Sequence, residues 1–159
     1  IAAPPDGPAT IRVGTLSKAL GSLGGFAAGP RSLVDLLVNG ARPFIFTTAS
    51  SPADTAAGLA ALRVLRSAEG AGLVARLRSV VDRVAPGHPS PIVPIVIGGE
   101  DEAMAAAAAL LERGVFVPAI RPPTVAPGTS RLRVAMSAAH TDEMVDRLMA
   151  GLEDLGLVR

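Results

Sequence analysis

The sequence contains no cysteine, tryptophan or tyrosine, and it has only two histidines, His88 and His140. Without cysteine, the chain can form no disulfide, no thiolate metal site and no cysteine nucleophile. Two histidines are too few for a histidine-rich metal site, so we expect no bound metal. The basic residues are scattered, and no tryptophan or tyrosine is present to stack on bases, which argues against a nucleic-acid partner.

Long apolar runs and an excess of one charge are absent as well. No uninterrupted apolar stretch reaches the ~18 residues of a membrane span, and residues 1–8 lack the basic and apolar regions of a signal peptide. Fifteen basic and fourteen acidic side chains leave a net charge of +1. With 159 residues, 49% of them hydrophobic, the chain is expected to be a cytoplasmic protein of about one domain, with a buried core and no membrane partner.

Lysine is almost absent too, since Lys18 stands alone against fourteen arginines. Thr15 and Ser17 place hydroxyl groups beside it, and small residues surround it in the segment TLSKALGSLG. The chemistry of pyridoxal phosphate (PLP) needs a lysine amine that forms a Schiff base with the cofactor, and donors for its phosphate. A P-loop fits less well because its glycine-to-lysine spacing is absent. The alternative interpretation is a solvated lysine in a glycine-rich turn.

The first half of the chain is expected to consist of short strands and helices. Ser51 can cap a helix, Pro52 suits its first turn, and Asp54 lies near the positive end of its dipole. High strand propensity marks Phe44 to Thr48 as a strand. Strands are predicted at residues 11–14, 24–29 and 44–48. Helices are predicted at residues 31–38, 51–67 and, after an interruption at Gly70 and Gly72, 73–84.

After a linker at residues 86–91, the pattern changes to a β-α-β-β-α unit. Its strands are predicted at 92–97, 115–120 and 131–136, and its helices at 100–113 and after a Thr141 cap. Pro94 indicates that the first of these strands lies at a sheet edge. In the last strand, Arg131 and Arg133 are expected to face away from the apolar side chains. The final helix is expected to bury an apolar stripe made of Met144, Val145, Leu148, Met149, Leu152 and Leu155.

A second segment, AIRPPTVAPGTSRLR at residues 119–133, brings two arginines into a proline-stiffened region. Arginine is the residue suited to planar, bidentate recognition of carboxylates, so Arg121 and Arg133 could converge on a carboxylate substrate. The alternative is that both are solvated. His88, in the linker, is expected to be exposed to solvent, and His140, just before the last helix, to be structural.

Together, the two segments resemble a known enzyme family. TLSKALGSLG resembles the PLP-attachment signature of class-II aminotransferase-like enzymes. The second segment, continuing through MSAAHT, resembles the C-terminal domain of α-oxoamine synthases, and its AIRPPTV form resembles their biotin-pathway members. The resemblance implies an α/β fold, the C-terminal part of a fold-type-I PLP-dependent transferase. Residues 1–87 would be the end of the large-domain sheet with bridging helices, and residues 88–159 a small α+β C-terminal domain.

The resemblance also implies roles for individual residues. Lys18 would be the catalytic residue and the point of cofactor attachment. The cofactor-binding residues would be Thr15, Ser17, Lys18, Thr47 and Thr48, the last two reaching the cofactor phosphate of a partner subunit in a homodimer with shared active sites. The substrate-binding residues would be Arg121, Thr124 and Arg133.

The implied reaction is a decarboxylative condensation of L-alanine with a pimeloyl thioester. The alternatives are a sibling enzyme that uses glycine or serine, and a non-catalytic fragment that serves in assembly. The family's ring-stacking histidine and its aspartate for the pyridine nitrogen belong to a preceding N-terminal half, whereas this sequence begins seventeen residues before Lys18. The chain is therefore expected to hold only part of the active site and to be inactive alone.

Overall fold

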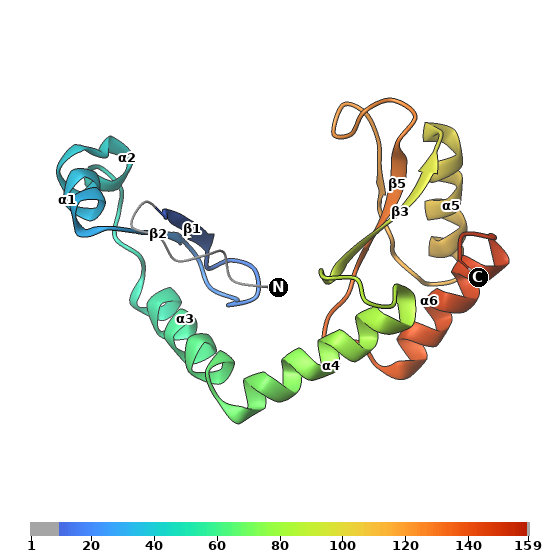
Figure 1. Ribbon diagram of the computed structural model, residues 1–159, viewed down its shortest axis with the longest axis horizontal. Coiled ribbons are helices and arrows are strands. Elements are labelled where there is room, and N and C mark those ends of the chain that lie inside the picture. The colour runs from blue at the N-terminus through green and yellow to red at the C-terminus, as the bar shows by residue number, and fades with distance from the viewer. Residues whose placement is uncertain (1–9, 159) are drawn as a thin grey trace. The chain divides into compact units, whose positions relative to one another are not determined.

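A computed structural model describes residues 10–158, which form two compact units (Figure 1). One unit extends to Ala71 and the other begins at Gly72. The division falls inside helix α4 (Ala68–Val84), because Val80, Val81 and Val84 are buried with the elements that follow them. The domain boundary at residue 88 remains a prediction. No helix among residues 10–158 is long and apolar enough to cross a bilayer.

The first unit begins with two of the predicted strands, which form a β-hairpin. Strands β1 (Arg12–Thr15) and β2 (Gly25–Ala28) pair antiparallel, with Thr15 opposite Gly25, and residues 16–24 connect them. Small residues are required here, because a side chain at Gly14 would overlap the Phe26 ring. The hairpin therefore presents residues 16–24 as a loop closed at its base.

The strand predicted at residues 44–48 is wrong. Helix α1 (Arg31–Gly40) is followed by a single helical turn, α2 (Arg42–Ile45). The backbone amides of Phe44 and Ile45 both donate to the Ala41 carbonyl oxygen, at 2.9 and 3.0 Å. Strand propensity expresses the fit to neighbouring strands, and within the described part of the chain no strand pairs with this segment.

Two longer helices follow. Helix α3 (Pro52–Leu65) is capped by Ser51, whose Oγ accepts from the Asp54 amide at 3.1 Å, as predicted. Helix α4 continues through Gly70, so the predicted interruption at the glycines is wrong. Gly70 is buried, and a side chain there would overlap the carbonyls of Val64 and Leu65. This glycine therefore permits a close approach of backbone segments rather than ending the helix.

The second unit has the predicted β-α-β-β-α order. Strand β3 (Ile92–Gly98) pairs antiparallel with β5 (Ser130–Ala135), which pairs with β4 (Ala119–Ile120). The strand order β3-β5-β4 places β3 at an edge, as Pro94 indicated. Strand β4 is shorter than the predicted strand at 115–120. Pro118 has no amide hydrogen with which to continue the ladder, although its carbonyl accepts from the Arg133 amide at 3.0 Å.

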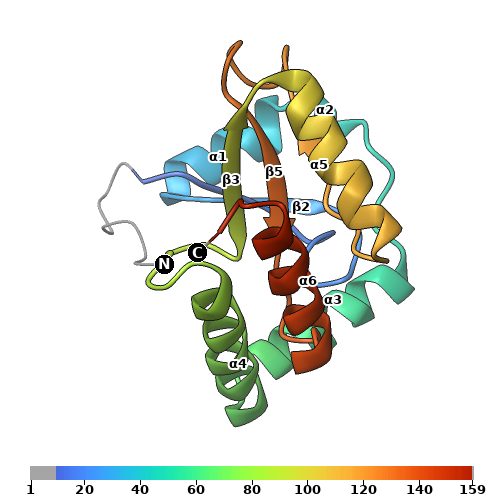
Figure 2. The ribbon, with the colours of Figure 1, turned by 90° about the vertical axis from the view of Figure 1, so that its right-hand side faces the viewer.

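Helices α5 (Glu100–Glu112) and α6 (Asp142–Asp154), together with α4, form the core with the sheet (Figure 2). Fully buried side chains from these helices and β5 make up its centre, namely Val80, Leu110, Leu132, Val145 and Leu152. Thr141 caps α6 by accepting from the Met144 amide at 3.3 Å, as predicted. The predicted stripe of α6 is wrong at Met144, which lies in the first turn and is 55% exposed.

His88 also differs from its prediction. It is only partly exposed, because its ring folds back onto its own linker. The ring Nδ1 lies 3.0 Å from the Ser90 carbonyl oxygen and 3.3 Å from the Ser90 amide nitrogen. The backbone of Ser90 is therefore a polar partner for the His88 ring, which the composition of the linker did not indicate.

Candidate functional site

Lys18 is an exposed residue in the loop that connects β1 and β2. The Leu16 amide donates to the Gly24 carbonyl and the Ser22 amide donates to the Leu16 carbonyl, both at 2.9 Å. The Gly21 amide donates to the Lys18 carbonyl at 3.0 Å. Gly21 and Gly24 have φ angles of +55° and +110°, a conformation that glycine adopts without steric cost. The loop is thus a closed, glycine-dependent turn around one primary amine.

Two hydroxyl groups lie together at the base of this loop. Thr15 Oγ1 and Ser17 Oγ are 2.8 Å apart, and the Ser17 amide donates to Thr15 Oγ1 at 3.2 Å. Both side chains are exposed. The structure therefore brings together the two hydroxyls that were predicted to bind a cofactor.

This group of residues fits PLP. The cofactor needs an amine for covalent attachment, hydrogen-bond donors for its phosphate, and a backbone that a bulky ring can approach. Lys18 supplies the amine, and Thr15 and Ser17 supply hydroxyls. Glycines leave the surrounding backbone bare, and at Gly25 a side chain would approach the Gly14 carbonyl oxygen to 2.9 Å.

Thr47 and Thr48 lie in the irregular segment between α2 and α3, and both are exposed. Within residues 10–158 neither donates to nor accepts from the Lys18 loop. The loop instead contacts the first turn of α3, where Ser22 Oγ donates to the Asp54 carbonyl oxygen at 2.6 Å. Their predicted role toward a partner subunit therefore remains a prediction.

The predicted substrate-binding residues lie in the second unit. Arg121 follows β4, and its Nη1 lies 3.8 Å from Glu100 Oε2, an ion pair with both side chains about half exposed. The Thr124 amide donates to the Arg121 carbonyl at 3.1 Å. Arg133 is exposed on the sheet face opposite the core, as predicted. In the described part of the chain, Arg121 thus has a carboxylate partner and the Arg133 guanidinium has none.

Arg131 shares that sheet face with Arg133. Its Nε donates to the Thr129 carbonyl at 3.0 Å, which holds the side chain close to its own strand. The sequence placed Arg131 on this face but gave it no role. Alternation along the strand was the signal for its placement.

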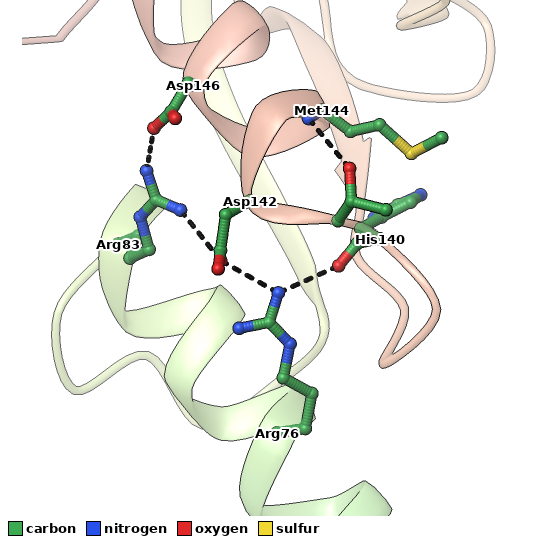
Figure 3. Close-up of polar contacts among 7 residues, drawn as sticks. Arg76, Arg83, His140, Asp142, Met144 and Asp146 are labelled. Carbon is green, nitrogen blue, oxygen red and sulfur yellow. Dashed lines mark hydrogen bonds and ion pairs between the residues drawn. The ribbon is translucent and has the colours of Figure 1, made fainter.

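An ion-pair cluster between α4 and α6 was not predicted (Figure 3). Asp142 Oδ1 accepts from Arg76 at 2.9 Å and from Arg83 at 3.2 Å, and Arg83 also binds Asp146. Arg76 donates in addition to the His140 carbonyl at 3.0 Å. The sequence signal was the helical spacing: the arginines are seven positions apart on α4 and the aspartates four apart on α6, so each pair shares one helix face. Their pairing requires knowing that the two helices are neighbours.

Hydrogen bonds in this region lower two carboxyl pKa values. The hydrogen bond from Arg76, followed by the charge of that guanidinium, holds the pKa of Asp142 below its ordinary value. The hydrogen bond with Thr141 does the same for the pKa of Glu143. The His140 ring Nδ1 accepts from the Ser137 amide at 3.2 Å, a structural contact of the kind expected for this residue.

A pocket lies in the second unit near the start of α6. Residues lining it include Val115, Phe116, Met136, His140, Met144 and Arg147. None of Arg121, Thr124 and Arg133 lines it. No cluster of three or more metal-ligating side chains occurs among residues 10–158.

The hairpin that carries Lys18 and the mixed α/β architecture fit the fold of PLP-dependent transferases. The family model described as aminotransferase class I and II matches residues 3–152, and the chain belongs to this family. The 8-amino-7-oxononanoate synthase of Anaeromyxobacter dehalogenans is 52% identical over 91% of the chain and 38% of that protein. The enzyme of the same name from a Methylobacterium species is 48% identical over 96% of the chain and 41% of that protein.

Solved structures agree with the sequence comparison. The Sphingomonas wittichii serine palmitoyltransferase matches 94% of this chain and 41% of its own, with a TM-score of 0.78 and 27% identity. A structure titled SPT with PLP internal aldimine matches 93% and 41%, with a TM-score of 0.77 and 26% identity. The 8-amino-7-oxononanoate synthase of Francisella tularensis matches 91% and 44%, with a TM-score of 0.74 and 25% identity. The predicted fold class is confirmed, and the chain spans about two fifths of the curated relatives that it matches.

Proposed function

We propose that this chain carries the cofactor-attachment lysine and the substrate-carboxylate arginine of an 8-amino-7-oxononanoate synthase. The reaction condenses L-alanine with a pimeloyl thioester, releases carbon dioxide and the thiol, and serves biotin biosynthesis. The observation that carries the proposal is the lone lysine in a closed glycine-dependent loop with Thr15 and Ser17 hydroxyls 2.8 Å apart at its base. The names of relatives about 50% identical to this chain support the product, 8-amino-7-oxononanoate. The two substrates are those that the family resemblance implies.

The residues of the first unit would hold the cofactor and move the proton. PLP, when bound, supplies an electron sink for negative charge at the substrate α-carbon. Lys18 anchors the cofactor and, once free, takes the α-proton at its Nζ, which requires a neutral amine. Thr15 and Ser17 donate hydroxyl hydrogens to the phosphate, while Thr47 and Thr48 serve the phosphate in the partner subunit of a cytoplasmic homodimer.

The residues of the second unit would hold the amino acid. Arg133 is exposed, and its guanidinium is not engaged by any carboxylate in residues 10–158, so it can bind the alanine carboxylate in a bidentate manner. Arg121 and Thr124 would complete the binding surface from the loop after β4. In this proposal residues 1–87 belong to the PLP-binding large domain, residues 88–159 form the small domain, and further active-site groups come from other parts of the whole protein.

A sibling condensation with serine or glycine is the second candidate. It is favoured by the fold match to serine palmitoyltransferases at TM-scores near 0.78. The sequence identity is 27% there, against 52% for an 8-amino-7-oxononanoate synthase, and this difference favours the first candidate and its amino acid, alanine. A chain that only assists assembly is the third candidate, and the match to about two fifths of the relatives' length is the observation behind it.

Turnover with three amino acids tests the proposal. The protein, at the full length that its gene encodes, is loaded with PLP and given a pimeloyl thioester with L-alanine, glycine or L-serine. We expect thiol release and carbon dioxide with alanine, and no turnover after Lys18→Ala. Turnover with glycine or serine but not alanine would transfer the assignment to the sibling enzymes. A loaded protein that turns over none of the three would support the assembly role.

A further inference from the structure

One hydrogen bond connects the Lys18 loop with helix α3. Ser22 lies four residues after Lys18, and its Oγ donates to the carbonyl oxygen of Asp54 at 2.6 Å, in a partly buried position. The two residues are 32 positions apart in the sequence. The contact is therefore a tertiary contact of the first unit, which forms only when the loop and α3 are packed together.

Both ends of this hydrogen bond are held in place. On the loop side, the Ser22 amide donates to the Leu16 carbonyl at 2.9 Å, which closes the turn around Lys18. On the helix side, Ser51 Oγ accepts from the Asp54 amide and donates to the Asp54 carboxylate, at 3.1 and 2.6 Å. Such a reciprocal cap fixes the first turn of a helix. Ser22 thus links a closed loop to an ordered helix start.

The next turn of α3 makes room for this contact. A Cβ at Gly58 would lie 3.3 Å from Ser22 Oγ, which is closer than most such contacts, and 3.5 Å from Ser22 Cβ, which is an ordinary van der Waals distance. Glycine is unfavourable inside a helix because of its backbone entropy. Its presence at position 58 lets the serine approach the helix backbone.

The link also fixes where the segment before α3 lies. Residues 47–50 lead directly into the Ser51 cap, and Gly24 at the base of the loop approaches Ser50, since a Cβ built on it would lie 3.9 Å from Ser50 Oγ. We propose that Ser22 is a positioning residue that orients the Lys18 amine by anchoring its loop to α3. This inference rests on the proposed function.

The test measures PLP affinity of the protein at the full length that its gene encodes. Titration with PLP is followed by the absorbance band of the attached cofactor, and Lys18→Ala identifies that band by abolishing it. Ser22→Ala is expected to raise the apparent Kd for PLP about fivefold, the change that loss of one hydrogen bond typically brings. Ser32→Ala, at an exposed serine of α1, is the matched control and is expected to leave the Kd unchanged.

A second variant covers the case in which Ser22→Ala does not fold. Gly58→Ala keeps both hydrogen-bonding groups, favours the helix, and displaces Ser22 by steric contact, so it should also weaken PLP binding. Ser22→Thr, which restores a hydroxyl, should recover affinity. Thermal unfolding monitored by circular dichroism shows which variants are folded at the titration temperature.

The outcomes separate the two proposals. If the wild-type protein shows no band that depends on Lys18, the proposed function fails, and Ser22 has no cofactor to position. If the wild-type band is present and folded Ser22→Ala, or Gly58→Ala in its place, binds PLP as tightly as Ser32→Ala does, the positioning role is overturned while the proposed function stands.

Discussion

Arg131 and Arg133 stand two residues apart on the same face of β5, and only their surroundings distinguish them. Arg131 is held by the Thr129 carbonyl at 3.0 Å, whereas the Arg133 guanidinium faces solvent with no partner among residues 10–158. A free guanidinium can engage a carboxylate through two parallel hydrogen bonds. The two arginines therefore form a natural pair of test and control.

Replacing Arg133 should affect amino-acid binding more than folding. Arg133→Ala is expected to raise the KM for the amino acid about 10- to 100-fold, because charge-assisted hydrogen bonds are lost. Arg133→Lys should recover only part of this, since an ammonium lacks the planar fork. The measurement is steady-state kinetics on the PLP-loaded protein at its full encoded length, with Arg131→Ala as the control. Equal KM values for the two alanine variants would show that Arg133 does not bind the amino-acid carboxylate.

For single residues, the sequence predicted groups that are close along the chain, but it did not predict contacts between residues far apart along the chain. Thr15 and Ser17 are two positions apart, and the sequence alone indicated that both hydroxyls lie near Lys18, although not that they contact each other. The Ser22–Asp54 hydrogen bond spans 32 positions, and no spacing rule connects the two. Arg121 was predicted to bind substrate, but its neighbour Glu100 became visible only when α5 and β4 were placed together.

At the scale of elements, capping residues correctly predicted where two helices begin, and the alternation of side chains correctly predicted which face of a strand is buried. Ser51 and Thr141 cap α3 and α6, and the arginines of β5 lie opposite the core. Predictions of secondary structure were wrong where the structure of a segment depends on the elements packed beside it. Residues 42–45 form the helical turn α2, and among residues 10–158 no strand lies beside them to pair with. Helix α4 includes Gly70, where the absence of a side chain permits close approach to the carbonyls of Val64 and Leu65 at the end of α3.

The contact between α4 and α6 predicts a pH-dependent stability. Hydrogen bonding and charge from Arg76 lower the pKa of Asp142 in the folded state. The unfolded state then binds a proton more readily, so the pair stabilises the fold above the unfolded pKa of about 4. This stabilisation is lost as the pH falls through the lower, folded pKa.

Asp142→Asn tests this contact. Thermal unfolding should show a lower melting temperature for the variant at neutral pH, and the difference from wild type should shrink toward about pH 3. Asp101→Asn, in the exposed first turn of α5, serves as the control for loss of a carboxylate near a helix start. A wild-type advantage that persists unchanged in acid would contradict the assignment of the effect to Asp142.

At the scale of the molecule, burial is unevenly distributed. Within residues 10–158, all buried hydrophobic side chains lie between Val80 and Leu152. The first unit has none, and large apolar side chains such as Val13 and Phe46 are 80% and 72% exposed. Such surface is typical of regions that are covered in an assembly.

The 159-residue chain expressed by itself should therefore associate. Sedimentation velocity is expected to show a weight-average mass that rises with concentration, and Val13→Thr combined with Phe46→Ser should reduce the rise. Ala139→Ser, an exposed position in the second unit, is the control. A monomer at every concentration tested would contradict the prediction, because it would show that the exposed apolar side chains do not cause association.

The solitary lysine has a practical consequence for chemical labelling. Among the 159 residues, Lys18 Nζ is the only side-chain amine, and it lies exposed in its loop. An acylating or reductively alkylating reagent can therefore modify this chain at one internal position besides its terminus. Protection of that position by a bound molecule would report occupancy directly by mass spectrometry, without any substitution in the protein.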